Sequence, residues 1–318
     1  MIKNLFKYFA FILAVYVLLK IIFDYFDKSI KFDTYDLEGY IYKKNFSVKS
    51  LTRPIIFIHL PNNTRLVPLE HRDITKVPEI NDALLYLNIK SVIRHCGKSY
   101  DIVIFDNTNV VDLLDDESDD VISTTRLTHI SGQNQKNWEN YVKCKILYKY
   151  GGIMMEPDFY FTNQINPNIY KDKQLKITSY ANEGVHVSNK HSVPHFNKLM
   201  IAEKYDPDLE ILMQYIAAIY ESQYDNTLMK FDNMHDKLSQ LHLLSPKMFG
   251  IQDKKDNIIQ VRDWMSANKE MILDETCFCV FINRDLLQKS RHFGWVLNMS
   301  ESQILHSNTN IGKFMNQN

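Results

Sequence analysis

The sequence has almost no net charge, and this shortage excludes one class of partner. Lys plus Arg number 37 and Asp plus Glu number 38, which gives a net charge of −1 over 318 residues. A chain with this balance has no field to hold a polyanion by counterion release, so nucleic acid is not an expected partner. The apolar fraction of 45% is ordinary for a packed globule, which excludes global disorder. No internal repeat or low-complexity tract appears.

Cysteine is also scarce. The four cysteines are Cys96, Cys144, Cys277 and Cys279. They lack the spaced pairs of a zinc ribbon, and Cys277 with Cys279 alone cannot complete a tetrahedral site. We therefore expect mostly buried thiols, with one disulfide left open if the domain lies in an oxidising compartment.

One apolar run stands near the N-terminus, over residues 8–23, and only Lys20 interrupts it. With its flanks the run approaches the roughly 20 residues that span a bilayer, and no small-residue cleavage site follows it. We predict an uncleaved transmembrane anchor over 1–26 and a stem over 27–52. A cleaved signal peptide and a helix packed on the globule are the alternatives. Basic residues ahead of the run favour a cytoplasmic N-terminus and hence a lumenal domain.

The remainder, 53–318, is predicted to be one α/β domain. Residues 54–60 form an almost wholly apolar run typical of a central parallel strand, 81–96 have helical spacing, and 100–105 form a second strand, which together predict a βαβ unit. A helix over 134–150 ends at Gly151-Gly152, a strand follows over 153–155, and 159–161 resumes it. In the second half, 208–219 and 232–244 have helical patterns, whereas the acidic stretch 112–120 is predicted to be a solvated loop.

Glu156-Pro157-Asp158 is the constellation most suited to chemistry. Two carboxylates that lie two residues apart leave a strand on the same face and both reach one hard cation. Proline between them removes a ladder donor, so the strand ends or bulges there. The acids are then exposed at the carboxyl end of the sheet, where open α/β folds bind ligands. A plain surface turn is the alternative.

Residues 138–161 resemble the DXD-containing sugar transferases, the group of fungal initiating mannosyltransferases, capsular polysaccharide transferases and the glucosyltransferase domains of clostridial toxins. In that family a helix carries an Asp and, three residues later, an Arg, and then leads through Gly-Gly and a strand into the DXD acids. The matching positions here follow without a gap: Asn140, Lys143, Leu147, Tyr150, Gly151, Gly152, Ile153, Met154, Glu156 and Asp158. Other stretches are similar to divergent members from large DNA viruses.

The resemblance implies a GT-A-like, Rossmann-type sandwich with a mainly parallel sheet and a helical C-terminal half. It implies metal-dependent transfer of a hexose from a nucleotide-sugar donor to a glycan or glycoconjugate, with retention of configuration. Glu156 and Asp158 would hold Mn²⁺ or Mg²⁺, Lys143 and Asp158 would be the catalytic residues, and Asn140 would contact the donor. His59 would replace the family's base-stacking Trp. No catalytic base is implied.

Three departures from the pattern leave other functions open. Asn140 lacks the charge of the family's Asp, Lys143 replaces a bidentate fork with a point charge, and Glu156 is one methylene longer than Asp. The second hypothesis is therefore a degenerate transferase fold that binds a glycan or a partner without turnover. A metal-dependent hydrolase or nuclease ranks last, because further His and Asp ligands at readable spacing are missing.

Overall fold

The computed structural model describes residues 37, 40–41, 48–60, 83–107, 109–114, 133–166, 169, 175–180, 193–194, 198–221, 242–267 and 271–317. The chain divides into two compact units, 1–39 and 40–318, and the second is described here. The predicted anchor over 1–26 and the acidic residues 115–120 lie outside the described residues, so both stay predictions. Within the described part, no helix has the length and apolarity that a membrane crossing requires.

The compact unit begins inside the predicted stem. The backbone N–H of Ile104 donates to the carbonyl of Tyr40 at 2.8 Å. Val48 is buried, with 5% of its surface exposed, and joins the main core. Its apolar side chain gains more from this core than from water, so part of the stem region belongs to the globular domain.

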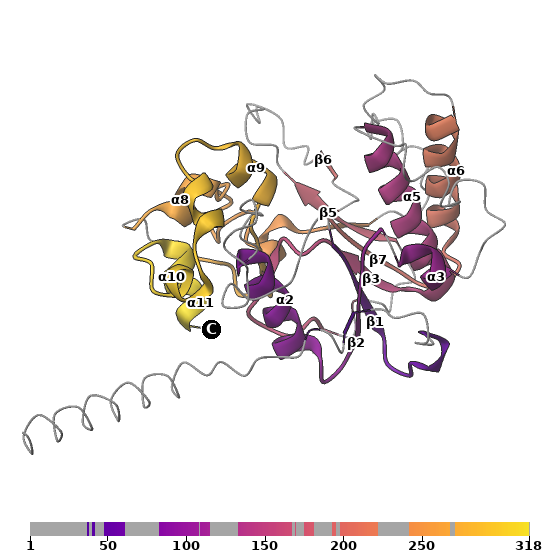
Figure 1. Cartoon of the computed structure of the whole chain (residues 1–318), viewed down its shortest axis with the longest axis horizontal. Helices are drawn as coiled ribbons and strands as arrows, with labels where there is room; N and C mark the ends of the chain where they lie inside the picture. The colour runs from indigo at the N-terminus through magenta and orange to yellow at the C-terminus, as the bar shows by residue number, and fades with distance from the viewer. Residues whose placement is uncertain are drawn as a thin grey trace, which may run out of the picture. The chain divides into compact units, whose positions relative to one another are not determined.

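A mixed sheet forms the centre of the domain (Figure 1). Its strand order is β2-β1-β3-β7-β5-β6, with β8 paired to β5. β1 runs parallel to both β2 and β3, and β8 runs parallel to β5, whereas β7 is antiparallel to β3 and β5. The strands are β1 (Ile55–His59), β2 (Asp101–Phe105), β3 (Gly152–Met155), β5 (Lys176–Tyr180), β6 (Val193–Pro194), β7 (Leu199–Ala202) and β8 (His242–Leu244).

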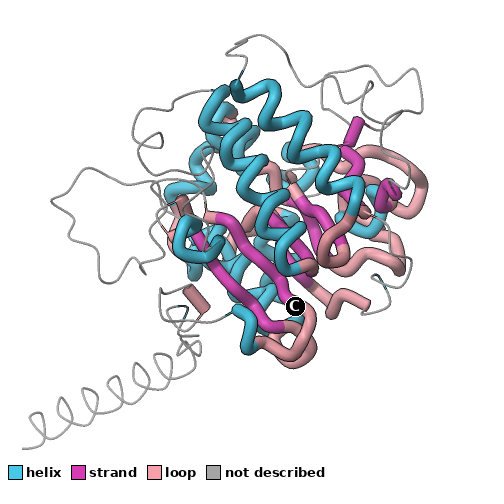
Figure 2. The backbone as a smooth tube through the Cα atoms, turned by 90° about the vertical axis from the view of Figure 1, so that its right-hand side faces the viewer, coloured by secondary structure: helices cyan, strands magenta, loops and turns pink. Residues whose placement is uncertain are grey.

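One face of this sheet is covered by α3 (Val110–Leu114), α5 (Gln133–Tyr150) and α6 (Pro207–Glu221). Alternate strand residues supply the sheet side of this core, for example Phe57, Met154 and Met200, as the two-residue period of a strand requires. Trp138 and Leu147 are among the helix residues that pack on them. Figure 2 views the molecule from this side and shows the helices lying across the strands.

A second core lies in the C-terminal part of the chain. There β4 (Phe159–Phe161) pairs antiparallel with β9 (Cys279–Phe281), and α2 (Ala83–Cys96) packs beside them. Tyr160, Trp264 and Val280 are buried in this core. The helices around it are α8 (Val261–Met265), α9 (Arg284–Lys289), α10 (Glu301–Leu305) and α11 (Asn310–Gln317), with the 3₁₀ helices η5 (Pro246–Phe249) and η6 (Gly294–Asn298).

Most of the predicted elements are confirmed. β1 is a central strand parallel to its neighbours, α2 ends at Cys96 just before Gly97, and α5 ends at Tyr150 just before Gly151. The helix predicted over 208–219 is α6. The four cysteines are free and buried, as expected for core thiols.

Three predictions are wrong. Residues 112–114, which begin the acidic stretch predicted to be a solvated loop, form the end of α3, and Leu113 and Leu114 are buried in the main core. Residues 242–244, the end of a predicted helix, form β8, because pairing with β5 satisfies their backbone groups. The part of that helix before residue 242 lies outside the described residues. Residues 159–161 do not resume the strand before them. They form β4 in a separate two-stranded sheet, since the turn at Pro157 carries the chain out of the main sheet.

Candidate active site

The Glu-Pro-Asp turn lies at the carboxyl edge of three parallel strands. His59 is the last residue of β1, Asn107 lies two residues beyond β2, and Glu156 follows β3 directly. Parallel strands end at the same edge of a sheet. These three side chains therefore lie close together although they are far apart in the sequence. The predicted position of the acids is confirmed.

Hydrogen bonds to the second core hold the turn. The side-chain amide of Asn88 on α2 donates to the carbonyl of Pro157 at 2.9 Å. The N–H of Ile282 donates to the carbonyl of Asp158 at 2.7 Å. On the same stretch, the N–H of Phe161 donates to the hydroxyl of Ser91 at 2.7 Å. The turn is therefore fixed from both sides.

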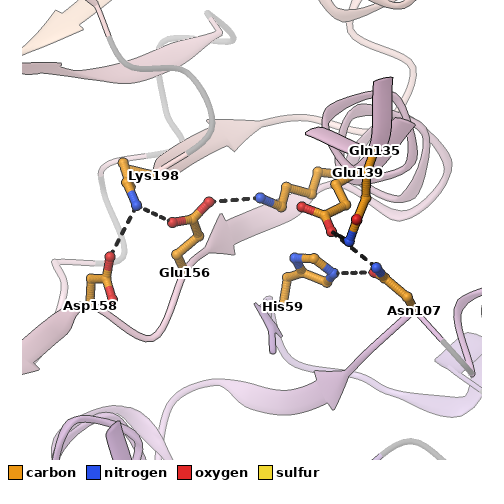
Figure 3. Close-up of polar contacts among 8 residues, drawn as sticks. His59, Asn107, Gln135, Glu139, Glu156, Asp158 and Lys198 are labelled. Atoms are coloured by element: carbon orange, nitrogen blue, oxygen red, sulfur yellow. Dashed lines mark hydrogen bonds and ion pairs between the residues drawn. The ribbon is translucent and has the colours of Figure 1, made fainter. Parts of the chain in front are cut away.

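Four charged residues form an alternating series, Asp158, Lys198, Glu156 and Lys143, which we call the charged row. Lys143 Nζ on α5 donates to Glu156 Oε1 at 2.8 Å, and Lys198 Nζ donates to Asp158 Oδ2 at 3.0 Å. Lys198 Nζ also donates to Glu156 Oε2. Figure 3 shows Lys198 between the two carboxylates. Each acid is thus bonded to at least one ammonium group.

The acids are not openly exposed, contrary to the expectation for a strand end. Asp158 has 6% of its surface exposed, and the Glu156 side chain is partly buried, with 17% exposed. Burial by itself would raise the pKa of Glu156, but the charges and hydrogen bonds of Lys143 and Lys198 together outweigh it and hold that pKa well below its usual range. The Glu156 carboxylate is therefore ionised and a weak proton acceptor.

Beside the charged row, His59, Asn107, Glu139 and Gln135 form a second series of contacts, the polar row (Figure 3). His59 Nε2 lies 2.7 Å from Asn107 Oδ1, and Asn107 Nδ2 donates to Glu139 Oε1 at 3.0 Å. Gln135 donates to the same carboxylate oxygen at 3.0 Å. Because the amide of Asn107 gives its N–H to the carboxylate, its oxygen accepts, so His59 carries its proton on Nε2.

His59 is neutral at physiological pH. Burial, followed by the charge of Lys143, lowers its pKa from 6.5 to about 4. The unfolded chain takes up a proton below pH 6.5, whereas the folded chain does so only near pH 4. The stability contributed by the neutral imidazole is therefore complete above pH 6.5 and is lost as pH falls toward 4.

We expect the free energy of unfolding of the wild type to fall by about 3 kcal/mol more than that of His59→Gln between pH 7 and 4. Glutamine keeps an N–H donor for Asn107 but does not titrate. Urea unfolding of both proteins across this range is the measurement. Parallel pH dependences would contradict the assignment of a buried neutral imidazole.

The structure brings the predicted site residues together in two groups. Lys143, Glu156 and Asp158 lie in the charged row, and Asn140 is buried one turn before Lys143 on α5, on the same helix face. His59 lies in the polar row and packs on Phe105 with 5.0 Å between ring centroids. It has 3% of its surface exposed. The base-stacking function of His59 and the donor contact of Asn140 stay predictions.

Sequence reasoning missed four residues of the site, namely Gln135, Glu139, Asn107 and Lys198. Glu139 could have been found, because it precedes Lys143 by four residues and so shares its helix face. Asn107 follows a predicted strand, and a polar residue in that position is a candidate for ligand binding in an open α/β sheet. Lys198 had no such signal, since its position depends on the antiparallel register of β3 and β7.

The acids do not offer a divalent ion a ready set of ligands. In the part of the chain that the structure describes, no three His, Cys, Asp or Glu side chains are grouped to hold a metal ion. Glu156 and Asp158 supply two carboxylates, and the ammonium of Lys198 bonds to both. The charges of the row already sum to zero, so Mn²⁺ or Mg²⁺ beside Lys198 would meet like charge. A divalent ion does not fit this arrangement.

Comparisons with known proteins give no relative in sequence. No family model matches the chain, and no curated protein matches it significantly. Among solved structures, it is similar to the PaToxG glycosyltransferase, with 9% identity and a TM-score of 0.36 over 55% of this chain and 63% of that one. It is also similar to a transferase in which two cysteines are replaced by serine, with 12% identity and a TM-score of 0.30 over 59% of this chain and 91% of that one.

Proposed function

We propose that this protein transfers a hexose from a nucleotide sugar to a glycan or glycoconjugate, with retention of configuration. One observation carries the proposal: Lys143, Glu156, Asp158 and Lys198 form a charged row, buried at Lys143 and Asp158 and partly buried at Glu156 and Lys198, at the carboxyl edge of β1, β2 and β3. This edge is where open α/β sheets bind ligands. Hydrogen-bonded ammonium groups held in fixed positions suit a leaving group that develops negative charge.

The reaction breaks the bond between the anomeric carbon and the phosphate oxygen of the donor. The bonding electron pair leaves with the nucleoside diphosphate, the acceptor hydroxyl oxygen bonds to the anomeric carbon, and its proton passes to the departing phosphate. This route needs no strong protein base, and ionised Glu156, paired with two ammonium groups, is a weak one.

The residues of the row then have separate functions. Of the two predicted catalytic residues, Lys143 neutralises Glu156 from the buried side, and Asp158 positions Lys198 through their hydrogen bond. Asn140, on the face of α5 that carries Lys143, contacts the donor sugar. Neutral His59 donates a hydrogen bond without adding charge to the site.

A second candidate is a binding protein without turnover. The observation that favours it is the same saturation of the acids: Glu156 bonds to two lysines and Asp158 to one. A fully neutralised row could stabilise an inactive fold as well as an active site. The two functions differ in whether a bound donor is cleaved.

Calorimetric titration of the full-length chain with UDP-, GDP- and CMP-sugars, joined to an assay of donor hydrolysis, tests the proposal. We expect one nucleotide to bind and its sugar to be released slowly. Asp158→Asn should lower hydrolysis by about ten- to a thousandfold, since one lost contact to a leaving-group cation forfeits about 1.4 to 4 kcal/mol. Binding without cleavage of any donor would favour the binding protein. Absence of binding across the panel would overturn the proposal.

A further inference from the structure

The position that two neighbouring carboxylates would offer a cation is occupied by a side chain of the protein itself. Lys198 Nζ donates to Asp158 Oδ2 at 3.0 Å and also to Glu156 Oε2 (Figure 3). We propose that Lys198 is the resident cation of the donor site and takes the place of a divalent metal in holding the diphosphate. This inference rests on the proposed function.

The register of the sheet places Lys198 there. β7 runs antiparallel to β3, and Met155 pairs with Leu199. The ladder continues by one residue, because the N–H of Glu156 donates to the carbonyl of Lys198 at 2.9 Å. Lys198 therefore faces Glu156 across the end of the sheet. Backbone hydrogen bonds fix the main chain of Lys198. Its ammonium group therefore reaches the acids at a small cost in conformational entropy.

Burial separates the functions of the two lysines. The Lys143 side chain is 3% exposed, whereas the Lys198 side chain is 15% exposed. A phosphate group arriving from solvent would meet Lys198 first, and a lysine ammonium binds phosphate as a point charge. Lys143 would neutralise Glu156 from the buried side and so keep Glu156 ionised for Lys198.

The charge balance excludes a divalent metal ion and the Lys198 ammonium at the same site together. With Lys198 present the charged row is neutral, and a dication would add two positive charges beside an ammonium. With Lys198 removed, the row has one net negative charge and two carboxylates facing a vacated position, which suits a hard divalent ion. Loss of one side chain should thus convert a metal-independent site into a metal-binding one.

The experiment is a calorimetric titration of the full-length chain with Mn²⁺ alone. We expect weak or undetectable Mn²⁺ binding by the wild type and by Lys198→Arg, which keeps the charge. Lys198→Ala and Lys198→Met should bind Mn²⁺ at least about tenfold more tightly than the wild type. Lys254→Ala is the control, because that lysine pairs with Glu275 far from the row in sequence and is half-exposed.

Nucleotide binding supplies the second arm. UDP and GDP are titrated with EDTA and, separately, with Mn²⁺. We expect the wild type to bind one of these nucleotides with the same affinity in EDTA and in Mn²⁺. Lys198→Ala should bind that nucleotide at least about tenfold more weakly than the wild type in EDTA, and Mn²⁺ should restore its affinity. Tight Mn²⁺ binding by the wild type, or nucleotide binding that requires Mn²⁺, would overturn the inference and leave the proposed function standing.

Two further outcomes are interpreted separately from the results above. If the wild type binds no nucleotide with or without Mn²⁺, the proposed function fails and the inference fails with it, whatever the Mn²⁺ titration shows. If Lys198→Ala and Lys198→Met do not fold, as judged by circular dichroism, the wild-type titrations still decide: EDTA-insensitive nucleotide binding supports a resident cation, and Mn²⁺-dependent binding contradicts it.

Discussion

Glu156→Gln is expected to lower the free energy of unfolding by about 3 to 5 kcal/mol, the cost of leaving a buried charge without its partner. Lys143 has 2% of its surface exposed and bonds to Glu156 Oε1 at 2.8 Å. In the variant, Lys143 and Lys198 would face a neutral amide and each other. Urea unfolding of the full-length chain is the measurement.

A second substitution separates this cause from a general loss of packing. Lys143→Met in the Glu156→Gln background removes the unpaired ammonium, so most of the lost stability should return. Glu275→Gln, which breaks an exposed pair with Lys254, should leave the unfolding curve unchanged. If Glu156→Gln unfolds at the wild-type urea concentration, the ion pair contributes nothing to the fold.

Gly152→Ala is expected to destabilise the chain by about 2 to 6 kcal/mol, from about 1 to 3 each of backbone strain and overlap. Gly152 has φ of 114°, which side chains rarely adopt. A Cβ there would lie 2.4 Å from the carbonyl oxygen of Ile55 on β1. The neighbouring strands would have to separate at the base of the site.

Gly294→Ala is the matched control, because its added Cβ would lie 3.2 Å from the nearest atom, the carbonyl oxygen of Leu287. Its effect should be small by comparison. Urea unfolding compares the two variants, and the yield of folded protein gives a second measure. Equal stability of Gly152→Ala and the wild type would show that β1 and β3 are not held as close as the structure has them.

The sequence pattern close to Glu156 predicted correctly where this residue lies in the fold. The apolar run of β1, the helical spacing of α5 and the Gly-Gly that ends it fix where Glu156 emerges, and each was readable. The proline indicated the end of the strand. These features depend on residues near one another in sequence.

The parts that sequence could not supply depend on pairing between distant segments. β8 takes its conformation from β5, and a helical pattern over 242–244 gives no hint of that partner. The exposure of the acids was misjudged for the same reason. Asp158 is covered because β7 places Lys198 opposite the turn, and single-sequence periodicity carries no register.

The bonds that hold the Glu-Pro-Asp turn also set an order of events during synthesis. Asp158 is fixed through the N–H of Ile282, and the hydroxyl of Tyr160, two residues later, donates to the carbonyl of Met315 at 3.1 Å. The sheet residues that carry the acids are thus made long before the residues that lock them. A ribosome must translate more than a hundred further codons after Asp158 before Ile282 exists. Until then the turn that carries the two acids has only its bonds to Asn88 and Ser91 on α2, which are made before it.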